Sequence, residues 1–391
     1  MAVLIIISGR FYIMTRIAIV TQFPMDPEQP RGGVEGVSVN LVKHIAQHND
    51  FEVIVITINE EISSQTQETW CNATIHRLPR LRSNMLFTTL FDGPKQIKSC
   101  LNEIKPDIVH AHDTYGIMVK NIETPKVFTI HGFIYGDTLV SEKKFPYLRS
   151  KIWKFVEQGG WAKQPNIISI SPYVRERLSG ITAAQIYDID NPISSRFFEV
   201  IPQREEAVVF SSAVISPRKN TLGVIKSFKH VAERMPNARL RLAGSVSHEE
   251  YYNQVKDYVE QNGLSNQVDF LGKISTEDVI SELSRAKIYI LLSYEENSPL
   301  GIEEAMASGV PVITSNRCGM PYMLKHGKSG YLVDCDNHTQ VATRILSILE
   351  DESLFLFMSD VSKKIAQDRY HPDGVAEMTI TTYKDILSQI E

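Results

Sequence analysis

Two carboxylates, Glu296 and Glu304, are the side chains whose spacing most clearly suggests chemistry. They lie eight residues apart, one on each side of an expected strand-to-helix turn. The amino end of a helix attracts phosphate through its unpaired N–H groups and its dipole. Carboxylates there would repel a phosphate unless they accept hydrogen bonds from hydroxyl groups of the same ligand, so a sugar nucleotide fits best. The alternative is a solvated helix start whose acidic residues complement the dipole, as we expect for Glu303.

Local signals predict the elements around this pair. The apolar, β-rich run 288–292 predicts a buried parallel strand, and open α/β sheets bind ligands beyond the carboxyl ends of such strands. Ser298 predicts the N-cap of a helix, and Pro299 predicts its first residue. A glycine and a proline about two and a half turns later predict where the helix ends. We therefore expect a helix over Pro299–Ser308, whose first N–H groups could hold a phosphate.

Two adjacent cations, Arg218 and Lys219, follow another expected strand. That strand covers Ala207–Ala213, and the next helix is expected to continue to Glu233. Lysine supplies a point charge and arginine a bidentate fork, so together they could neutralise a departing diphosphate. A solvated basic loop is the alternative that these residues alone leave open.

The first half of the chain offers a pair of glycines, Gly32 and Gly33, before a helix expected to run through Ala46. They follow the expected strand 16–21 and a proline-rich loop. Paired glycines let a phosphate approach the backbone closely, although such a pair by itself is a weak signal and favours a plain tight turn.

Three histidines lie at the ends of two further expected strands. His110 and His112 close the strand that begins at Ile108, and His131 follows the strand 127–130. A His-x-His pair could bind a metal, but no third ligand stands at a usable spacing and structural histidines are commoner. We therefore predict no metal site.

The segment 289–331 resembles the signature of glycosyltransferase family 4, retaining enzymes of the GT-B fold. Two glutamates separated by seven residues carry the likeness, and Glu296 and Glu304 occupy both places. The resemblance implies that Glu304 binds the nucleotide ribose and that Glu296 contacts the donor sugar near the reacting carbon. A Glu-Asn-Ser-Pro sequence stands where many relatives have glycine and phenylalanine, which leaves the donor sugar open. Diphosphate contacts are implied for Asn297, Ser298, Pro299 and Leu300.

The resemblance extends from about Thr15 to the C-terminus, with the other motifs in the expected order. Lys219 matches the family's diphosphate lysine, whereas the partner arginine falls on Ala213, so Arg218 is the expected replacement. His131 matches a histidine near the reacting carbon, for which hydrogen bonding is favoured over nucleophilic attack. Further donor contacts are implied for Gly32 and Gly33 and, near the base, for Gly244, Lys273 and Ile274.

Alternating strands and helices indicate an α/β protein with a parallel sheet in each half. The resemblance makes this the GT-B fold, two Rossmann-like domains whose sheets face each other across a cleft. A chain of 391 residues with 43% hydrophobic content is ample for two cores. Asp188 and Asp190 have the D-x-D spacing of another transferase fold, but we interpret them as structural. The expected parts are an acceptor-binding domain over 14–192, a linker over 193–206, a nucleotide-sugar-binding domain over 207–371, and a C-terminal helix over 372–391 that packs on the first domain.

Charge and cysteine content narrow the class of protein. A net charge of −5 and a pI near 6.2 give no reason to expect nucleic-acid binding. The four scattered cysteines indicate free thiols in a reducing cytosol, so a cytoplasmic protein is predicted. The apolar run 1–13 is too short to span a bilayer and lacks a signal-peptide pattern, and Met14 is a candidate for the natural start.

Two stretches, 77–105 and 143–163, interleave basic and aromatic residues. This composition favours an anionic interface or a lipid-linked acceptor. Ordinary amphipathic helices that pack on the sheet are the alternative, so peripheral attachment to the inner face of the cytoplasmic membrane is a hypothesis at this stage.

The predicted function is retaining transfer of a sugar from a nucleoside diphosphate to a hydroxyl acceptor. Arg218 and Lys219 would stabilise the departing diphosphate while Glu296 orients the sugar. The resemblance implies catalysis without metal or cofactor, in cell-surface polysaccharide or glycolipid biosynthesis. The alternatives are a sugar-nucleotide 2-epimerase of the same fold and a relative that binds sugar nucleotides without catalysis. A nicotinamide oxidoreductase is disfavoured because no G-x-G-x-x-G follows the first strand, and an exported sugar-binding protein because no signal peptide is evident.

Overall fold

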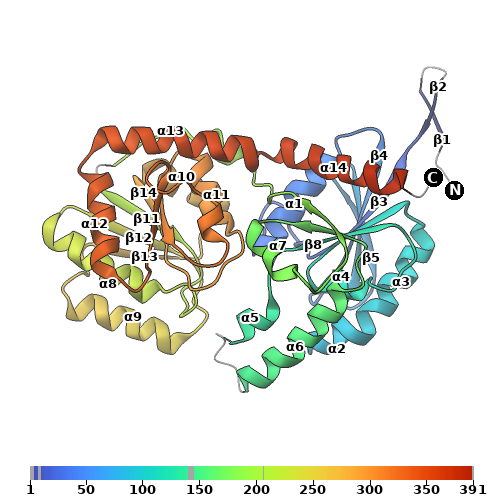
Figure 1. The fold of residues 1–391 in the computed structure, drawn as a ribbon, viewed down its shortest axis with the longest axis horizontal. Coiled ribbons are helices and arrows are strands. Elements are labelled where there is room, and N and C mark those ends of the chain that lie inside the picture. Colours follow the sequence, from blue (N-terminus) through green and yellow to red (C-terminus); the bar gives the residue numbers. More distant parts are fainter. Residues whose placement is uncertain (1–3, 8–9, 140–144, 206, 390–391) are drawn as a thin grey trace. The chain divides into compact units, whose positions relative to one another are not determined.

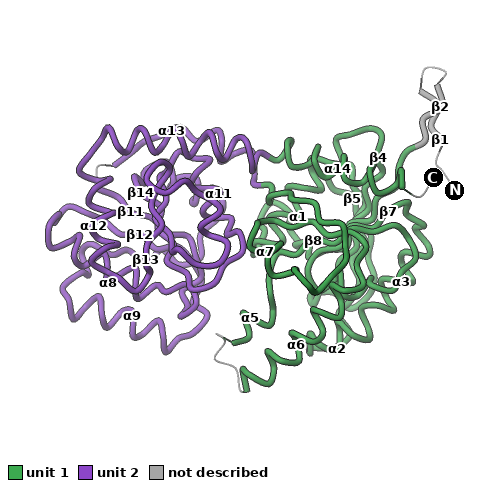
Figure 2. Tube along the Cα trace, viewed as in Figure 1, with its two compact units in different colours: residues 1–192, 372–391 green, residues 193–371 purple. Residues whose placement is uncertain are grey.

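The computed structural model describes residues 4–7, 10–139, 145–205 and 207–389 (Figure 1). The chain folds into two compact units (Figure 2). The first unit contains residues 1–192 and 372–391, and the second contains residues 193–371. Strands alternate with helices in both units, as the sequence predicts for an α/β protein.

An eight-stranded sheet forms the centre of the first unit, in the order β10-β9-β8-β7-β3-β4-β6-β5. Its neighbours are parallel except for β5 and β6, whose antiparallel pairing adds a hairpin edge to the predicted parallel sheet. Left-handed backbone at Cys71 and Asn72 makes the tight turn that this hairpin needs. A separate antiparallel hairpin joins β1 (Leu4–Ile7) and β2 (Arg10–Ile13). The sheet consists of β3 (Thr15–Val20), β4 (Phe51–Asn59), β5 (Thr66–Trp70), β6 (Ala73–Pro79), β7 (Ile108–His112), β8 (Lys126–Ile130), β9 (Asn166–Ser169) and β10 (Gln185–Asp188).

Helices cover both faces of this sheet because successive residues of a strand point to opposite sides. Ile17 and Ile19 of β3 share a core with α1 and α14, whereas Ala18 and Val20 share another with α3. The C-terminal helix α14 packs on α1, which confirms the prediction that it returns to the first domain. The helices are α1 (Gly33–Ile45), α2 (Met85–Phe87), the π-helical turn η1 (Thr88–Asp92), α3 (Gly93–Ile104), α4 (Thr114–Met118), α5 (Ile134–Leu139), α6 (Pro146–Trp161), α7 (Pro172–Leu178) and α14 (Pro372–Ser388).

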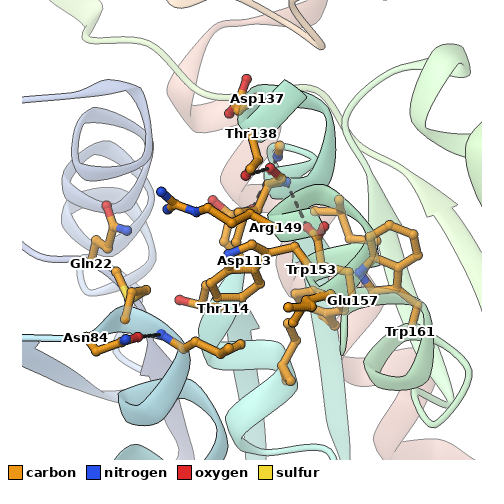
Figure 3. A pocket seen from close by; sticks show the side chains of 18 of the residues that line it. Gln22, Asn84, Asp113, Thr114, Asp137, Thr138, Arg149, Trp153, Glu157 and Trp161 are labelled. Atoms are coloured by element: carbon orange, nitrogen blue, oxygen red, sulfur yellow. Dashed lines mark hydrogen bonds between the residues drawn. The ribbon is translucent and has the colours of Figure 1, made fainter. Parts of the chain in front are cut away.

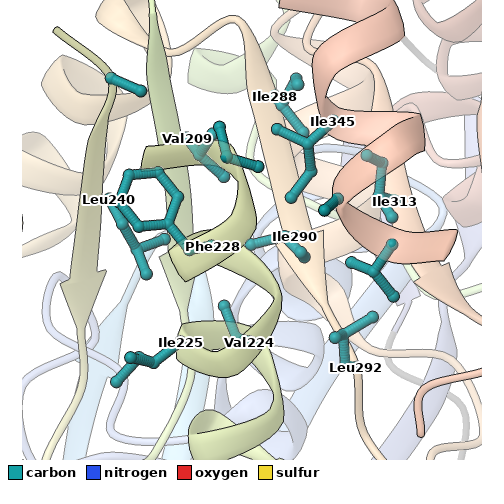
Figure 4. Packing of buried hydrophobic residues seen from close by; sticks show 14 of the residues in the cluster. Val209, Val224, Ile225, Phe228, Leu240, Ile288, Ile290, Leu292, Ile313 and Ile345 are labelled. Carbon is teal, nitrogen blue, oxygen red and sulfur yellow. The ribbon is translucent and has the colours of Figure 1, made fainter. Parts of the chain in front are cut away.

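A six-stranded parallel sheet forms the centre of the second unit, in the order β13-β12-β11-β14-β15-β16. One face packs on α8 and α12, where Ile290 meets Phe228 and Ile345 in a continuous apolar core (Figure 4). The strands are β11 (Val208–Ser212), β12 (Arg239–Ala243), β13 (Val268–Gly272), β14 (Ile288–Leu291), β15 (Val312–Ser315) and β16 (Gly330–Val333). The helices are η2 (Ser195–Phe197), α8 (Thr221–Arg234), α9 (Glu249–Gln261), α10 (Thr276–Arg285), α11 (Leu300–Ala307), η3 (Met320–Tyr322), α12 (His338–Leu349) and α13 (Glu352–Arg369).

The segment 193–205 is fastened to the second unit through Arg204. Its guanidinium donates to the carbonyl oxygens of Ser284 at 3.0 Å and Ser308 at 2.7 Å, at the ends of α10 and α11. The last carbonyls of a helix lack intrahelical partners and carry the negative end of the dipole, so a cation satisfies both ends at once. This contact holds the segment against α11, the helix that carries Glu304.

Three members of the basic and aromatic stretches lie inside the first unit, contrary to a reading of those stretches as surface. Arg77 is 1% exposed and forms an ion pair with Glu68 at 2.7 Å across the β5–β6 hairpin. Trp153 and Trp161 of α6 are also buried. The strand position of Arg77 and the inward face of α6 decide their burial, because side chains on one face of an element share one environment.

Candidate functional site

Four neighbouring strands bring the predicted donor-site residues of the second unit to one edge of its sheet. The strands β13, β12, β11 and β14 are adjacent and parallel, so the loops at their carboxyl ends share that edge. The loop after β11 carries Arg218 and Lys219, and the loop after β14 carries Glu296. Gly244 follows β12, and Lys273 and Ile274 follow β13.

Arg218, Lys219 and Glu296 converge on one point. One oxygen of Glu296 accepts from Nη1 of Arg218 at 2.9 Å and pairs with Nζ of Lys219. The side chain of Glu296 is 11% exposed. Burial by itself would raise the pKa of Glu296, but Lys219 and Arg218 hold that pKa below its ordinary value. The glutamate is therefore ionised and offsets one of the two positive charges that the sequence assigns to a diphosphate.

A sharp turn lets two adjacent residues reach the same carboxylate. The N–H of Lys219 donates to Oγ of Ser216, and the N–H of Asn220 donates to the carbonyl of Pro217 at 3.0 Å. Asn220 has a left-handed φ of 52°, a conformation that asparagine tolerates, and its side chain caps α8. The turn thus brings Arg218 and Lys219 to the same carboxylate, and whether Arg218 replaces the arginine missing at Ala213 stays a prediction.

The loop that carries Glu296 is held by close backbone packing. The carbonyl of Glu296 accepts from the N–H of Gly319 at 2.9 Å. A Cβ added to Gly319 would lie 1.7 Å from the carbonyl oxygen of Asn297, so a larger residue would displace this loop. Arg218 also donates to the carbonyl of Glu295 at 2.8 Å, which links the two loops of the site.

The helix after this loop corrects two sequence predictions. It begins at Leu300, one residue later than predicted, and its N-cap is Pro299 in extended conformation. Ser298 is not the N-cap, and its hydroxyl donates to Oε1 of Glu303 at 2.7 Å. Glu303, predicted to be solvated, is 0% exposed, since it points into the core side of α11 where Ser298 can reach it. Leu300 and the residues after it still present the first N–H groups of α11 at this edge of the sheet.

Glu304 occupies a different environment from Glu296. Burial raises its pKa to about 7. Within the described part of the chain, no hydrogen bond or ion pair engages its carboxylate. A desolvated carboxylate without a partner is suited to accept hydrogen bonds from the hydroxyl groups of a ligand.

The residues predicted near a nucleotide base have structural surroundings of their own. A Cβ at Gly244 would lie 1.9 Å from the carbonyl oxygen of Ala213, and its φ is 152°, so close packing of two loops by itself requires glycine. Lys273 is exposed, whereas Ile274 packs partly on the core beside α11. Whether any of them contacts a base stays a prediction.

A row of stacked histidines lies at the carboxyl edge of the first unit's sheet. His110 stacks on His112 with ring centroids 4.3 Å apart, and His112 stacks on His131 at 5.1 Å. Nδ1 of His112 lies 2.8 Å from Nε2 of His131, a hydrogen bond between the two rings. Both ring nitrogens of His110 are engaged, with Tyr383 at 2.6 Å and Thr129 at 2.7 Å. Burial lowers the pKa of His110 to about 3 and also lowers those of His112 and His131, so the row is neutral near pH 7.

Asp113 is a functional candidate that the sequence prediction missed. It follows His112 with a left-handed φ of 46°, and its carboxylate accepts from the N–H groups of His131 at 2.8 Å and Gly132 at 3.3 Å. These bonds orient the backbone that presents His131. The sequence signal was available, because a carboxylate stands directly after a strand that ends in His-x-His.

A pocket of about 820 Å³ opens beside Asp113 in the first unit (Figure 3). Its walls combine the aromatic side chains of Trp153 and Trp161 with the polar side chains of Asp113, Thr114 and Glu157. Glu157 accepts from the N–H groups of Ile134 and Tyr135, both at 2.9 Å, and burial raises its pKa to about 8. No pattern in the sequence separated Glu157 from ordinary helical glutamates.

The glycine loop of the first unit leaves open space. Gly32 precedes α1 in extended conformation, and an added Cβ would meet no atom within 4 Å. Glu35 in the first turn of α1 accepts from the N–H of Arg31 at 2.6 Å, which holds the loop against the helix. Gly32 and Gly33 are thus accessible to a ligand, as the prediction of a phosphate contact requires.

Family comparisons agree with this arrangement. The model of the family described as Glycosyltransferase Family 4 matches residues 31–196, and the model described as Glycosyl transferases group 1 matches residues 194–367. This chain is a family 4 glycosyltransferase. The two matched regions together contain the histidine row, the two cations and both glutamates of the signature.

Two curated proteins similar to this glycosyltransferase are themselves named as glycosyltransferases. It is 27% identical over 206 residues to poly(glycerol-phosphate) alpha-glucosyltransferase of Bacillus subtilis, a match that covers 52% of this chain but 30% of that protein. An uncharacterized glycosyltransferase of Methanocaldococcus jannaschii is 25% identical over 384 residues, which cover 90% of this chain and 92% of that protein.

Solved structures support the GT-B fold of this glycosyltransferase. Sucrose-phosphate synthase from Thermosynechococcus elongatus superposes with a TM-score of 0.80 at 19% identity, covering 96% of this chain and all of that one. Anabaena HepE in complex with UDP and glucose superposes with a TM-score of 0.72 at 16% identity, covering 95% of this chain and 100% of that one. At these identities the likeness establishes the fold alone.

Proposed function

We propose that this glycosyltransferase moves a sugar from a nucleoside diphosphate onto a hydroxyl acceptor with retention of configuration. The convergence of Arg218, Lys219 and Glu296 at the carboxyl edge of the second unit's sheet carries this proposal. Two cations that share one carboxylate oxygen can exchange it for the oxygens of a diphosphate. Support for a nucleotide sugar also comes from HepE, a relative in fold that was solved with UDP and glucose.

In the proposed reaction the bond between the anomeric carbon and the diphosphate breaks and a bond to the acceptor oxygen forms on the same face. The acceptor proton passes to an oxygen of the departing diphosphate. Arg218, Lys219 and the first N–H groups of α11 neutralise the charge that develops on that leaving group, which is why we propose that no metal is needed. Glu296, released by the cations, orients the sugar, and Glu304 holds the ribose.

The acceptor is proposed to bind in the first unit, where the pocket of about 820 Å³ lies near His131. Asp113, whose carboxylate accepts from the N–H of His131, lines this pocket. A 2-epimerase would need no acceptor, so this pocket favours transfer over epimerisation. We propose a hydroxyl of a saccharide or lipid-linked saccharide as acceptor, in polysaccharide or glycolipid biosynthesis in the cytoplasm. No helix among the described residues is long and apolar enough to cross a bilayer.

Nucleotide sugars should raise the melting temperature of the protein, because a ligand that binds only the native state stabilises it. We expect a shift with one class among UDP, GDP and ADP sugars, and its loss in Glu304→Ala. Incubation of that donor with and without candidate acceptors, followed by product analysis, then separates transfer from epimerisation. Absence of any shift with all three classes would contradict the proposed donor.

The hydrogen bond between His112 and His131 should matter for transfer and not for donor binding. Replacing His112 with phenylalanine keeps the stacked ring but removes the polar contact to His131, so we expect kcat to fall about tenfold. The affinity for UDP, which the second unit provides, should not change. In the control Tyr383→Phe, a hydrogen bond to His110 is lost while the His112–His131 contact remains, and transfer should change less. Equal losses in both variants would show that only the packing of the row matters.

A further inference from the structure

Helix α6 of the first unit exposes several large apolar side chains on one face. Phe155 is 82% exposed and Tyr147 is 77% exposed, and Leu148 and Ile152 are also largely exposed. The opposite side of the helix is buried through Trp153, Val156 and Trp161. We define the α6 face as Tyr147, Leu148, Lys151, Ile152, Lys154 and Phe155. Single exposed apolar residues are ordinary, but large ones gathered on one face mark an interaction surface.

The neighbouring element extends this surface. Leu86 of α2 and Leu90 of η1 pack against the apolar cluster that Trp153 and Val156 of α6 form with Ile117 of α4, so α2 and η1 lie close to α6 (Figure 1). Their outward residues Phe87 and Phe91 are exposed and contact each other, with ring centroids 5.7 Å apart. Exposed apolar side chains are therefore present on α2 and η1 as well as on the α6 face.

Charge on the α6 face has one sign. Residues 145–163 contain four basic residues, Arg149, Lys151, Lys154 and Lys163, and one acidic residue, Glu157. Glu157 is buried and its raised pKa keeps it largely neutral at pH 7, so it does not offset the surface cations. This concentration of positive charge occurs in a protein whose net charge is −5. An anionic partner is the complement that such a face selects.

We propose that the α6 face docks the first unit onto an anionic lipid bilayer, with Leu148 and Phe155 entering the headgroup boundary. Alternating cations and large apolar groups on one helix face are the features of helices that lie in a membrane interface. A second copy of this chain is a poorer occupant, because a two-fold interface would bring Lys151 and Lys154 against their own equivalents.

The pocket of the first unit opens next to this surface. Ile152 of the α6 face and Met85 of α2 both line the pocket and are both partly exposed. If the proposed transfer is correct, an acceptor anchored in the bilayer by an apolar tail would enter the pocket from this side. The docking itself does not depend on the proposed function.

Sedimentation with lipid vesicles tests the docking. Wild type should bind vesicles of phosphatidylcholine that contain about one-third phosphatidylglycerol, and it should bind much more weakly to vesicles of phosphatidylcholine alone. Binding to the anionic vesicles should weaken as NaCl rises from about 50 to about 500 mM. We expect the partition coefficient to fall about tenfold or more in the variants Leu148→Ser/Phe155→Ser and Lys151→Glu/Lys154→Glu. The control Leu356→Ser/Phe357→Ser changes two exposed apolar residues of α13 and should bind as wild type does.

Three outcomes would overturn the proposal. These are no binding of wild type to anionic vesicles, unchanged binding by both α6 variants, and a lipid-free dimer in gel filtration that Leu148→Ser/Phe155→Ser abolishes, which would make a second copy the occupant. Thermal shifts with UDP are measured on every variant. We expect the UDP response to come from the second unit. Loss of vesicle binding with an intact UDP response would contradict the docking and leave the proposed transfer standing. Vesicle binding without a UDP response would contradict the proposed donor and leave the docking standing.

Discussion

Replacing Glu296 with glutamine is expected to strengthen UDP binding while it abolishes most sugar transfer. In the structure this carboxylate pairs with both Arg218 and Lys219, so a diphosphate has to displace it and also meets its negative charge. Glutamine has the same shape without that charge, and we expect UDP to bind about threefold to tenfold more tightly. Transfer should fall by about 100-fold or more, because the group proposed to orient the sugar at the reacting carbon is lost.

Titration calorimetry with UDP and initial rates with the identified donor measure the two effects separately. The matched control is Lys219→Met, which removes a cation and should weaken UDP binding about tenfold or more along with transfer. Opposite changes in UDP affinity in these two variants are the distinctive result. Weaker UDP binding in Glu296→Gln would show that the ion pairs of the ligand-free protein do not compete with the diphosphate.

Replacing Glu304 with glutamine should make the ligand-free protein more stable at alkaline pH and weaken its binding of nucleotides. Burial raises the pKa of this carboxyl to about 7 from an ordinary value near 4.5. Below about pH 4.5 it is protonated in both the folded and the unfolded protein and costs nothing. Between these two pKa values the unfolded state ionises first, so the free energy of unfolding falls as pH rises and stays reduced above pH 7.

Chemical denaturation of wild type and Glu304→Gln at several pH values measures this effect. We expect the variant to gain about 1 to 3 kcal/mol over wild type near pH 8 and little near pH 4.5. UDP affinity should fall about tenfold, because a neutral amide accepts hydrogen bonds from hydroxyls less strongly than a carboxylate does. A neighbour on the same helix, Glu303→Gln, serves as the contrast: its carboxylate accepts from Ser298, so its loss should not stabilise the protein. A stability gain independent of pH would refute the desolvation argument.

The local structure around the residues predicted to bind the donor was largely predictable, because it is set within short segments. The strand that ends near Leu292, the turn at Asn297–Leu300 and the helix with Glu304 follow one another within a few residues. The start of α11 and the burial of Glu303 were predicted wrongly. Capping rules consider only whether the Ser298 hydroxyl can accept from a backbone N–H. In the fold this hydroxyl instead donates to the buried carboxylate of Glu303.

The surroundings of His131, the residue predicted for the acceptor side, were anticipated less completely. Its partners lie apart in sequence: His112 and Asp113 reach it across neighbouring strands, and Tyr383 comes from the last helix to His110. The side chains of α6 that line the pocket are likewise distant in sequence from His131. Trp153 and Phe155 are both aromatic and lie two positions apart, yet one is buried and the other is among the most exposed large side chains described.

The alternation of strands and helices along the chain therefore predicted the α/β class and the two-part organisation, and the resemblance of its motifs predicted the family and singled out Glu296 and Glu304. Three-dimensional packing decided which cations and carboxylates form ion pairs, which histidines form hydrogen bonds with each other, and which side of α6 faces solvent. These outcomes depend on strand order and on the direction of side chains from distant elements, and neither is encoded in any single stretch of sequence.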